Sequence, residues 1–149
     1  MEDTTRLHRA VRAVLPNWEA WKNRRGVPLT YRMTQILTGH GVFGEFLLRI
    51  GREVTSICHH CKEGEDTAQH TLGSCPAWEE PRRMLQAEIG VNLAPEAIAE
   101  ATLRDRREYS AVRVFCERVM LAKEWAKRDR IRTGDLARVD RSERSARGG

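Results

Sequence analysis

Apolar residues recur along most of the chain at intervals of three and four, which is the spacing of one face of an α-helix. The longest such run extends from about Arg106 to Arg130, with charged residues on the opposite face. Its apolar positions are Tyr109, Val112, Phe115, Cys116, Val119, Ala122 and Ala126. The alternation that is typical of β-strands is scarce. The pattern therefore predicts an all-α fold.

Shorter runs with the same spacing predict further helices. They cover residues 7–15, 29–38, 42–50, 78–89 and 95–103. Pro16 ends the first run, and Asn17 is a plausible N-cap for a short helix that carries Trp18 and Trp21 and stops by Gly26. We expect both tryptophans to pack on a neighbouring helix rather than to stack on bases.

Glycine and proline mark several expected helix ends. Gly39-His40-Gly41 predicts a tight turn between two helices, in which His40 caps a helix or contacts a phosphate. Gly90 is expected to stop the helix that contains an early Pro81. Pro95 is expected at the first position of the next helix.

The end of the chain has a different composition. From Ile131 the apolar content falls, and Arg, Asp, Ser and Gly dominate, which predicts a disordered basic tail over residues 131–149. We therefore divide the chain into a helical segment (1–57), a cysteine-rich segment (58–75), a second helical segment (76–130) and the tail. A length of 149 residues is typical of one small domain.

Metal-ligating residues are concentrated in the cysteine-rich segment. Cys58, Cys61, His70 and Cys75 have the spacing C-x2-C-x8-H-x4-C. Two cysteines two residues apart can bind one ion, and three thiolates with one imidazole form a tetrahedral set that Zn²⁺ prefers. The sequence therefore predicts a zinc knuckle with one structural Zn²⁺.

A short helix is expected to carry His70 to the ion. Asp66 fits an N-cap with Gln69 three residues later, and Gly73 would end the helix so that Cys75 turns back. Three thiolates and the dication give a formal charge of −1, which Lys62, Arg82 and Arg83 would offset.

Several alternatives stand beside this ligand set. His59 or His60 can compete with His70, although residues inside a two-residue spacer usually point away from the ion. The cysteines can be ordinary buried thiols, or Cys58 and Cys61 a redox pair, although no βαβ context surrounds them. Cys116 lies on the apolar face of the long helix and is expected to be a core thiol.

No enzyme motif accompanies the cluster. The sequence has no P-loop, GxSxG, HExxH or GxGxxG motif, and four protein ligands leave a metal no open position. We therefore expect neither catalysis nor a small-molecule substrate from this chain alone.

Charge indicates a different class of partner. The net charge is +5, and basic ends flank a mildly acidic middle, which suits a polyanion and equally a solvated surface. The residues expected to contact RNA or DNA are Arg24, Arg25, Lys62, Arg82 and Arg83. No apolar run reaches the roughly 18–20 residues of a membrane helix, and the acidic start is unlike a secretory signal, so an intracellular protein is expected.

The order of the motifs resembles a known family. Leu37-Thr38-Gly39-His40-Gly41, Arg49-Ile50-Gly51, the cysteine–histidine cluster, Cys75-Pro76-Ala77-Trp78 and 119–124 occur in one sequence. Together they resemble the C-terminal region of the reverse-transcriptase polyproteins of insect non-LTR (LINE-like) retrotransposons, over roughly residues 17–128.

The resemblance implies a CCHC zinc motif, formed by Cys58, Cys61, His70 and Cys75, that contacts template RNA or target DNA in target-primed reverse transcription. It also implies the polymerase portion of the parent polyprotein as a partner and residence in the nucleus. The second ligand gap is eight residues, which differs from the retroviral nucleocapsid knuckle. The polymerase's catalytic aspartate motif is absent, so this chain is not expected to polymerise DNA.

These observations lead to three hypotheses about function. The leading one is a zinc-binding nucleic-acid module. The second is a zinc-stabilised module that docks on the polymerase or another protein, which the acidic middle and the long amphipathic helix favour. The third is an inactive remnant of a retroelement.

Overall fold

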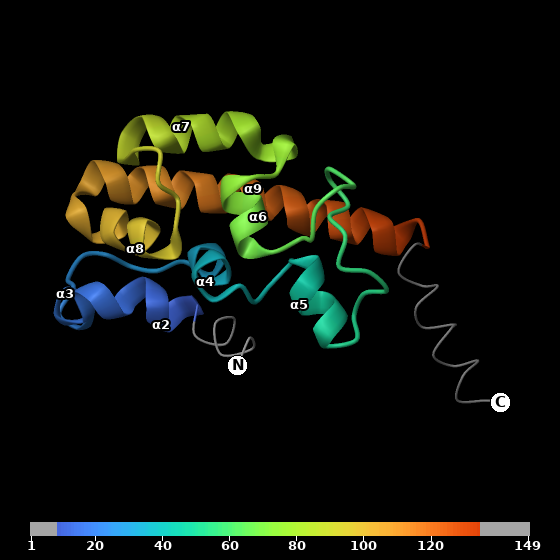
Figure 1. Cartoon of the computed structure of the whole chain (residues 1–149), viewed down its shortest axis with the longest axis horizontal. Helices are drawn as coiled ribbons and strands as arrows, with labels where there is room; N and C mark the ends of the chain where they lie inside the picture. Colours follow the sequence, from blue (N-terminus) through green and yellow to red (C-terminus); the bar gives the residue numbers. More distant parts are fainter. Residues whose placement is uncertain (1–8, 135–149) are drawn as a thin grey trace.

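The computed structural model describes residues 9–134 of the chain, and Figure 1 shows their arrangement. The described part is built from α-helices and short 3₁₀ turns, so the predicted all-α class is confirmed. Its only β contact is a single antiparallel bridge between Ile57 and Glu65. The elements in order are α2 (Arg9–Val14), η1 (Leu15–Asn17), α3 (Trp18–Lys22), α4 (Tyr31–Thr38), α5 (Gly44–Arg49), α6 (Ala68–Gly73), η2 (Pro76–Trp78), α7 (Glu79–Ile89), α8 (Pro95–Arg104) and α9 (Arg106–Arg132).

The long helix α9 is the element against which the others pack. Asp105 begins it as an N-cap, because its carboxylate accepts the backbone N–H of Glu108 at 2.8 Å. Its apolar stripe faces inward and contacts α4, α7 and α8 (Figure 1). The buried residues of the stripe are Val112, Phe115, Cys116, Val119 and Met120. The stripe predicted from sequence thus forms one wall of the core.

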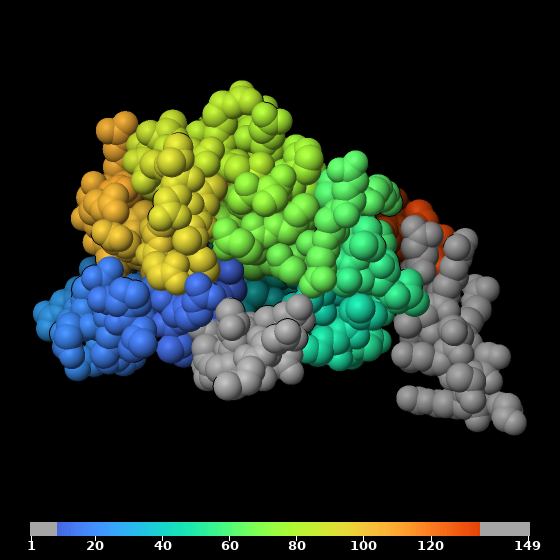
Figure 2. Space-filling view, viewed as in Figure 1, coloured from blue at the N-terminus to red at the C-terminus, as the bar shows by residue number. Residues whose placement is uncertain are grey.

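Helices α2 and α4 form a second tier against this wall. In the space-filling view the blue N-terminal helices lie along one side of the yellow and green segments (Figure 2). Helix α2 contacts α4 and α8, and α4 contacts α6. Met33, Ile36 and Leu37 are buried as the spacing predicts, and Gly39 ends α4 in the left-handed conformation with φ +74°.

The two N-terminal tryptophans differ in environment. Trp21 is 3% exposed and belongs to the core, whereas Trp18 is 49% exposed. The packing predicted for both is therefore confirmed for Trp21 only. Asn17 makes no side-chain capping bond, and α3 ends at Lys22, before Gly26.

Asp66 has a different role from the predicted one. The N-cap of α6 is Thr67, whose hydroxyl accepts the backbone N–H of His70 at 2.9 Å. Asp66 is buried instead, and one of its oxygens accepts the N–H of Gly44 at 3.0 Å. The capping prediction was wrong by one residue, because both Asp and Thr are good N-caps.

The other oxygen of Asp66 forms a buried ion pair with Lys123 of α9. The Nζ–Oδ1 distance is 2.7 Å, and the two side chains are 1% and 7% exposed. The ammonium also lies over the ring of Phe43, 5.5 Å from its centroid. Backbone bonds from Glu45 to the Asp66 carbonyl and from Asp66 to the Ser56 carbonyl complete the cluster. Asp66 therefore joins the loop before α6, the start of α5 and the middle of α9.

A second charged contact ties α4 to α9. Arg32 donates to both oxygens of Glu124, at 2.8 and 3.0 Å, and to Glu117 at 3.0 Å. These hydrogen bonds raise the pKa of the Arg32 guanidinium above its usual range. A bidentate arginine–carboxylate pair fixes orientation as well as distance. It therefore sets the angle at which α4 crosses α9.

The boundary of the predicted tail is corrected by the structure. Helix α9 continues to Arg132, two residues beyond the expected end and into the segment predicted to be disordered from Ile131. Residues 135–149 of that segment lie outside the described part. Within residues 9–134, no helix combines the length and hydrophobicity that a membrane span requires.

We predict that Lys123→Met destabilises the fold by about 3–5 kcal/mol, because it leaves a buried carboxylate without its partner. Urea unfolding followed by circular dichroism measures the loss. Lys22→Met is the matched control, since Lys22 is 52% exposed and pairs only with Glu19. Equal stability of the two variants would contradict the role of the buried pair.

Candidate metal centre

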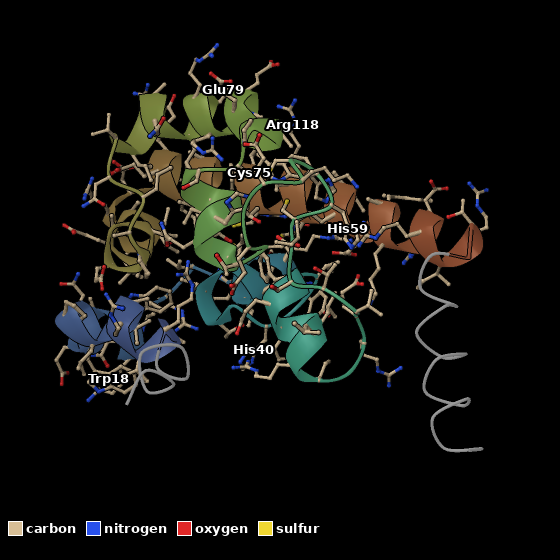
Figure 3. The ribbon with its side chains drawn as sticks, turned by 45° about the vertical axis from the view of Figure 1, so that its right-hand side comes forward. Trp18, His40, His59, Cys75, Glu79 and Arg118 are labelled. Carbon is tan, nitrogen blue, oxygen red and sulfur yellow. The ribbon has the colours of Figure 1, made fainter. Side chains whose placement is uncertain are left out.

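Four side chains converge on one point between the loop before α6 and the start of η2. The possible ligand atoms of Cys58, Cys61, His70 and Cys75 all lie within 4.8 Å of one another. The sulfurs of Cys58 and Cys75 are 3.9 Å apart, and the Cys61 sulfur is 3.4 Å from His70 Nε2. Figure 3 shows Cys75 in the middle of the molecule. The four residues predicted from spacing therefore form a set that can hold a metal ion.

A tight turn presents the first two cysteines. The Cys58 N–H donates to the Gly64 carbonyl at 2.7 Å, and the Lys62 N–H donates to the Cys58 carbonyl at 2.8 Å. Lys62 has φ +66°, the only positive value among the described non-glycine residues. The left-handed conformation lets the chain reverse immediately after Cys61, so both sulfurs lie on the same side of the turn.

Helix α6 presents the histidine. The Thr67 cap fixes the first turn of the helix, and His70 extends from that turn with Nε2 toward Cys61. Its ring lies so close to Gly64 that a Cβ there would be 2.7 Å from His70 Cε1. Glycine at position 64 therefore makes room for the ligand.

The end of α6 positions the last cysteine. The N–H groups of Ser74 and Cys75 both donate to the His70 carbonyl, at 2.9 and 2.7 Å, so the chain turns back as it leaves the helix. Arg82 of α7 then holds this turn by donating to the carbonyls of Leu72, Thr71 and Cys75 at 2.8, 3.1 and 2.7 Å.

The local environment shifts the pKa values of Cys61 and Cys75 in opposite directions. The amides of Glu63 and Gly64 donate to the Cys61 sulfur and lower the pKa of this thiol to about 6. Burial raises the pKa of Cys75 to about 12. A metal ion would meet a thiolate at Cys61 and displace a proton from Cys75, so metal affinity rises with pH.

The neighbouring histidines are occupied elsewhere. His59 Nε2 lies 3.0 Å from the buried carboxylate of Glu53. The ring of His60 lies 4.9 Å from that of Trp78, and burial, aided by the charge of Lys123, lowers the pKa of His60 to about 4. Neither belongs to the metal-ligand cluster, so the structure selects His70 from the three histidines left open by the sequence.

Cys116 lies in the core, away from the cluster. It is 1% exposed on the inner face of α9, and burial raises the pKa of its thiol. This placement confirms the prediction of a core thiol.

The five cations predicted to contact nucleic acid do not form one patch. Arg24, Arg25, Lys62 and Arg83 are exposed, but the first two follow α3 while Lys62 belongs to the metal turn. Arg24 donates to the carbonyls of Trp21 and Val27 and lies over the Trp21 ring. Arg82 is 9% exposed, so its guanidinium supports the metal segment from inside instead of facing a phosphate.

A basic and aromatic surface that sequence reasoning missed lies on the C-terminal half of α9. Trp125 is 60% exposed, and the guanidinium of Arg128 lies 5.4 Å from its ring centroid. Lys127 and Arg130 are half-buried, and the exposed Arg132 pairs with Asp129, so Arg128 is the cation that lies beside the exposed ring. The signal was a tryptophan among basic residues, which is typical of surfaces that bind nucleic acid.

No family model, curated protein or solved structure matches the chain. The retroelement resemblance therefore rests on the order and spacing of this chain's own motifs.

We predict that the purified chain binds one metal ion and that His70→Ala loses it while His60→Ala keeps it. Only the first variant removes a ligand of the cluster. Metal content after gel filtration, measured by atomic spectroscopy, checks the prediction. Loss of metal from the His60 variant alone would overturn the assignment of His70.

We also predict that Gly64→Ala weakens metal binding by about 10–100-fold, because the added methyl displaces the His70 ring. Competition with a chromophoric chelator measures the affinity. Gly73→Ala is the control, since its Cβ would meet only the flexible Gln69 amide, at 3.4 Å. The same affinity for both variants would contradict the close fit of Gly64 and His70.

Proposed function

We propose that the metal is Zn²⁺ and that its role is structural. Tetrahedral zinc, with Zn–S of about 2.3 Å and Zn–N of about 2.0 Å, separates two sulfurs by about 3.8 Å and a sulfur and a nitrogen by about 3.5 Å. The corresponding distances of 3.9 and 3.4 Å are close to these values. Three thiolates favour zinc over hard cations, and four protein ligands leave no open position for chemistry.

We further propose that the zinc-held module contacts RNA or DNA through the C-terminal half of α9. The observation that carries this proposal is the exposed Trp125 ring beside Arg128. An exposed ring can stack on a base while neighbouring cations contact phosphates. Four of residues 125–132 are basic and one is acidic, and this Asp129 pairs with Arg132, which leaves Arg128 as the exposed cation beside the ring.

The metal segment lies against this half of α9. The charges of Lys123 and Arg130 both act on His60, which places the metal turn next to the helix (Figure 1). Lys62 on that turn adds an exposed cation. Loss of zinc would therefore disturb one border of the proposed contact surface.

The sequence resemblance supports the same function. It would make the chain the nucleic-acid-contacting C-terminal part of a non-LTR reverse-transcriptase polyprotein, acting beside its polymerase. A role at chromosomal DNA would place it in the nucleus. Arg24, Arg25 and Arg83 stay as predicted secondary contacts on other parts of the surface.

We predict that Trp125→Ala weakens binding of single-stranded RNA or DNA by about 1–3 kcal/mol, whereas Trp18→Ala has little effect. Trp18 is a matched control because it is also half exposed, at 49%, and lies at the other end of the molecule from the labelled His59 (Figure 3). Fluorescence anisotropy at low salt measures both affinities.

Charge reversal at Arg128 should reduce the affinity further and flatten its dependence on salt. Equal loss in the Trp18 and Trp125 variants, or binding that salt does not weaken, would contradict the proposed surface.

A specific groove favours protein docking as the second candidate. Between α7 and α9 lies a groove of about 300 Å³, lined by Leu85, Ala111 and Phe115 and bordered by the exposed Met84 and Val114. Such an apolar groove suits a partner helix. Absence of RNA and DNA binding at low salt would favour this role over the first.

A further inference from the structure

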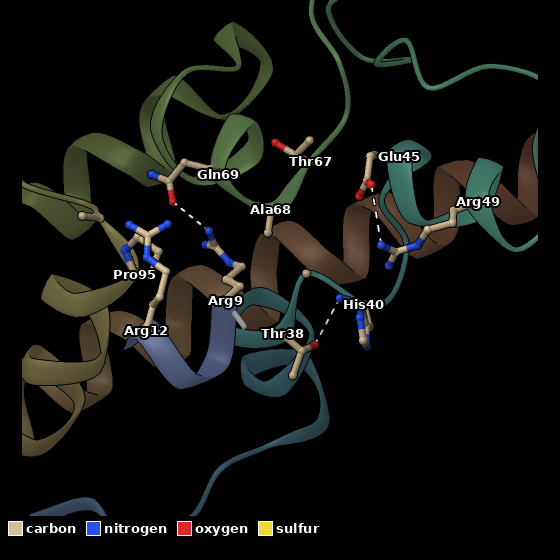
Figure 4. Close-up of a pocket in the computed structure, with 12 residues that line it drawn as sticks. Arg9, Arg12, Thr38, His40, Glu45, Arg49, Thr67, Ala68, Gln69 and Pro95 are labelled. Atoms are coloured by element: carbon tan, nitrogen blue, oxygen red, sulfur yellow. Dashed lines mark hydrogen bonds and ion pairs between the residues drawn. The ribbon is translucent and has the colours of Figure 1, made fainter. Parts of the chain in front are cut away.

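A separate pocket of about 440 Å³ opens where α2, α5 and the starts of α6 and α8 meet, and none of the four metal-ligating residues lines it. Figure 4 shows its side chains. Arg9 and Arg12 come from α2, Arg49 comes from α5, and His40 lies in the turn between α4 and α5. None of these residues belongs to the metal cluster or to the surface proposed for α9.

The pocket carries an excess of positive charge. Three guanidiniums line it, and Glu45 is the one lining carboxylate. Glu45 lies 4.0 Å from Arg49, and Arg12 lies 3.4 Å from Glu96, which is outside the lining. These two carboxylates match two of the three lining arginines, and the third arginine is in neither pair.

Arg9 accounts for that excess. Its Nε donates to the Ile36 carbonyl at 3.0 Å, and its Nη1 donates to Gln69 Oε1 at 3.1 Å. Both acceptors are neutral, so these bonds position the guanidinium without cancelling its charge. Burial and the nearby Arg12 lower the pKa of Arg9 to about 10, although the charge of Glu96 acts in the opposite direction.

Two other inward-facing cations of the described fold have carboxylate partners. Lys123 pairs with Asp66, and Arg32 pairs with Glu117 and Glu124. Arg82 resembles Arg9 in that its acceptors are neutral backbone carbonyls, but it does not line the pocket. Within residues 9–134, the two groups that Arg9 hydrogen-bonds are neutral, so an anionic ligand would meet a guanidinium that is positioned at the pocket and still charged.

We propose that this pocket binds a phosphate monoester, held by Arg9, Arg12 and Arg49. Guanidiniums recognise phosphate oxygens through paired, charge-assisted hydrogen bonds, and a monoester carries close to two negative charges at neutral pH. The volume lies in the range of small-ligand sites and admits the group attached to the phosphate. Because several helices wall the pocket, it suits the end of a molecule better than a strand that continues past it.

Two sources supply this chemistry, a free nucleotide and the 5′ end of a nucleic-acid strand. The second rests on the proposed nucleic-acid function, whereas the first does not. The experiment therefore uses inorganic phosphate, a nucleoside monophosphate, and one short single-stranded DNA with either a 5′-phosphate or a 5′-hydroxyl. Calorimetric titration of the zinc-loaded full chain at low salt measures each affinity.

We expect the 5′-phosphorylated strand to bind about tenfold or more tightly than the 5′-hydroxyl strand, or the mononucleotide to bind with the strands showing no difference. The first result assigns a strand end to the pocket, and the second assigns a free nucleotide. No binding of phosphate or nucleotide, together with equal binding of the two strands, overturns the proposal.

Arg12→Gln and Arg49→Gln should abolish the preference for phosphate, and either variant suffices if the other folds poorly. Both side chains are partly exposed, at 52% and 39%, so thermal melting should change little. Arg104→Gln, at 47% exposure and outside the pocket lining, is the matched control and should keep the preference. A preference that survives both pocket variants also overturns the proposal.

The variants distinguish the proposed pocket from the proposed nucleic-acid surface of α9. Trp125→Ala should weaken both strands equally and leave their ratio unchanged, whereas the pocket variants change the ratio and spare the 5′-hydroxyl strand. If the 5′-hydroxyl strand does not bind at all, the phosphate and nucleotide titrations still test whether the pocket binds a phosphate monoester.

Discussion

The buried carboxylate of Asp66 is the contact on which the arrangement of the described fold depends. It accepts the Gly44 N–H at the start of α5 and pairs with Lys123 near the middle of α9, while its backbone bonds to the segments around Ser56 and Glu45. A carboxylate this deep is stable only while its partners stay in place. The pair therefore fixes the loop before α6 relative to the core, and that loop carries the metal ligands.

The metal-ligand cluster adds a second set of contacts that fix the segment before α6. Residues 50–67 contain no helix, and their regular backbone structure consists of turns and one β-bridge. Cys58 and Cys61 lie in this segment, whereas His70 lies within α6 and Cys75 follows the end of that helix. An ion bound by all four would close a loop of chain that has few apolar contacts of its own. Arg82 gives the same turn a third support from α7, through three carbonyls.

The sequence could predict what depends on local spacing. The stripe of α9, the Gly39 cap and the four ligands follow from residues a few positions apart, and all agree with the structure. Long-range partners could not be predicted in this way. Nothing near Asp66 indicates that its partner is Lys123, 57 positions away, so the local pattern predicted a helix cap at this position. Arg82 was assigned to the surface for the same reason, because its acceptors are backbone carbonyls that a sequence does not distinguish.

The proposed structural role of zinc requires that the fold depends on the bound ion, and thermal unfolding with and without a zinc chelator measures this dependence. A metal bound only by the folded chain stabilises that chain in proportion to its affinity. Circular dichroism at the helix wavelengths should therefore show that the chelator lowers the melting temperature strongly or abolishes the cooperative transition. Unchanged helicity and an unchanged melting temperature after removal of the metal would contradict the claim.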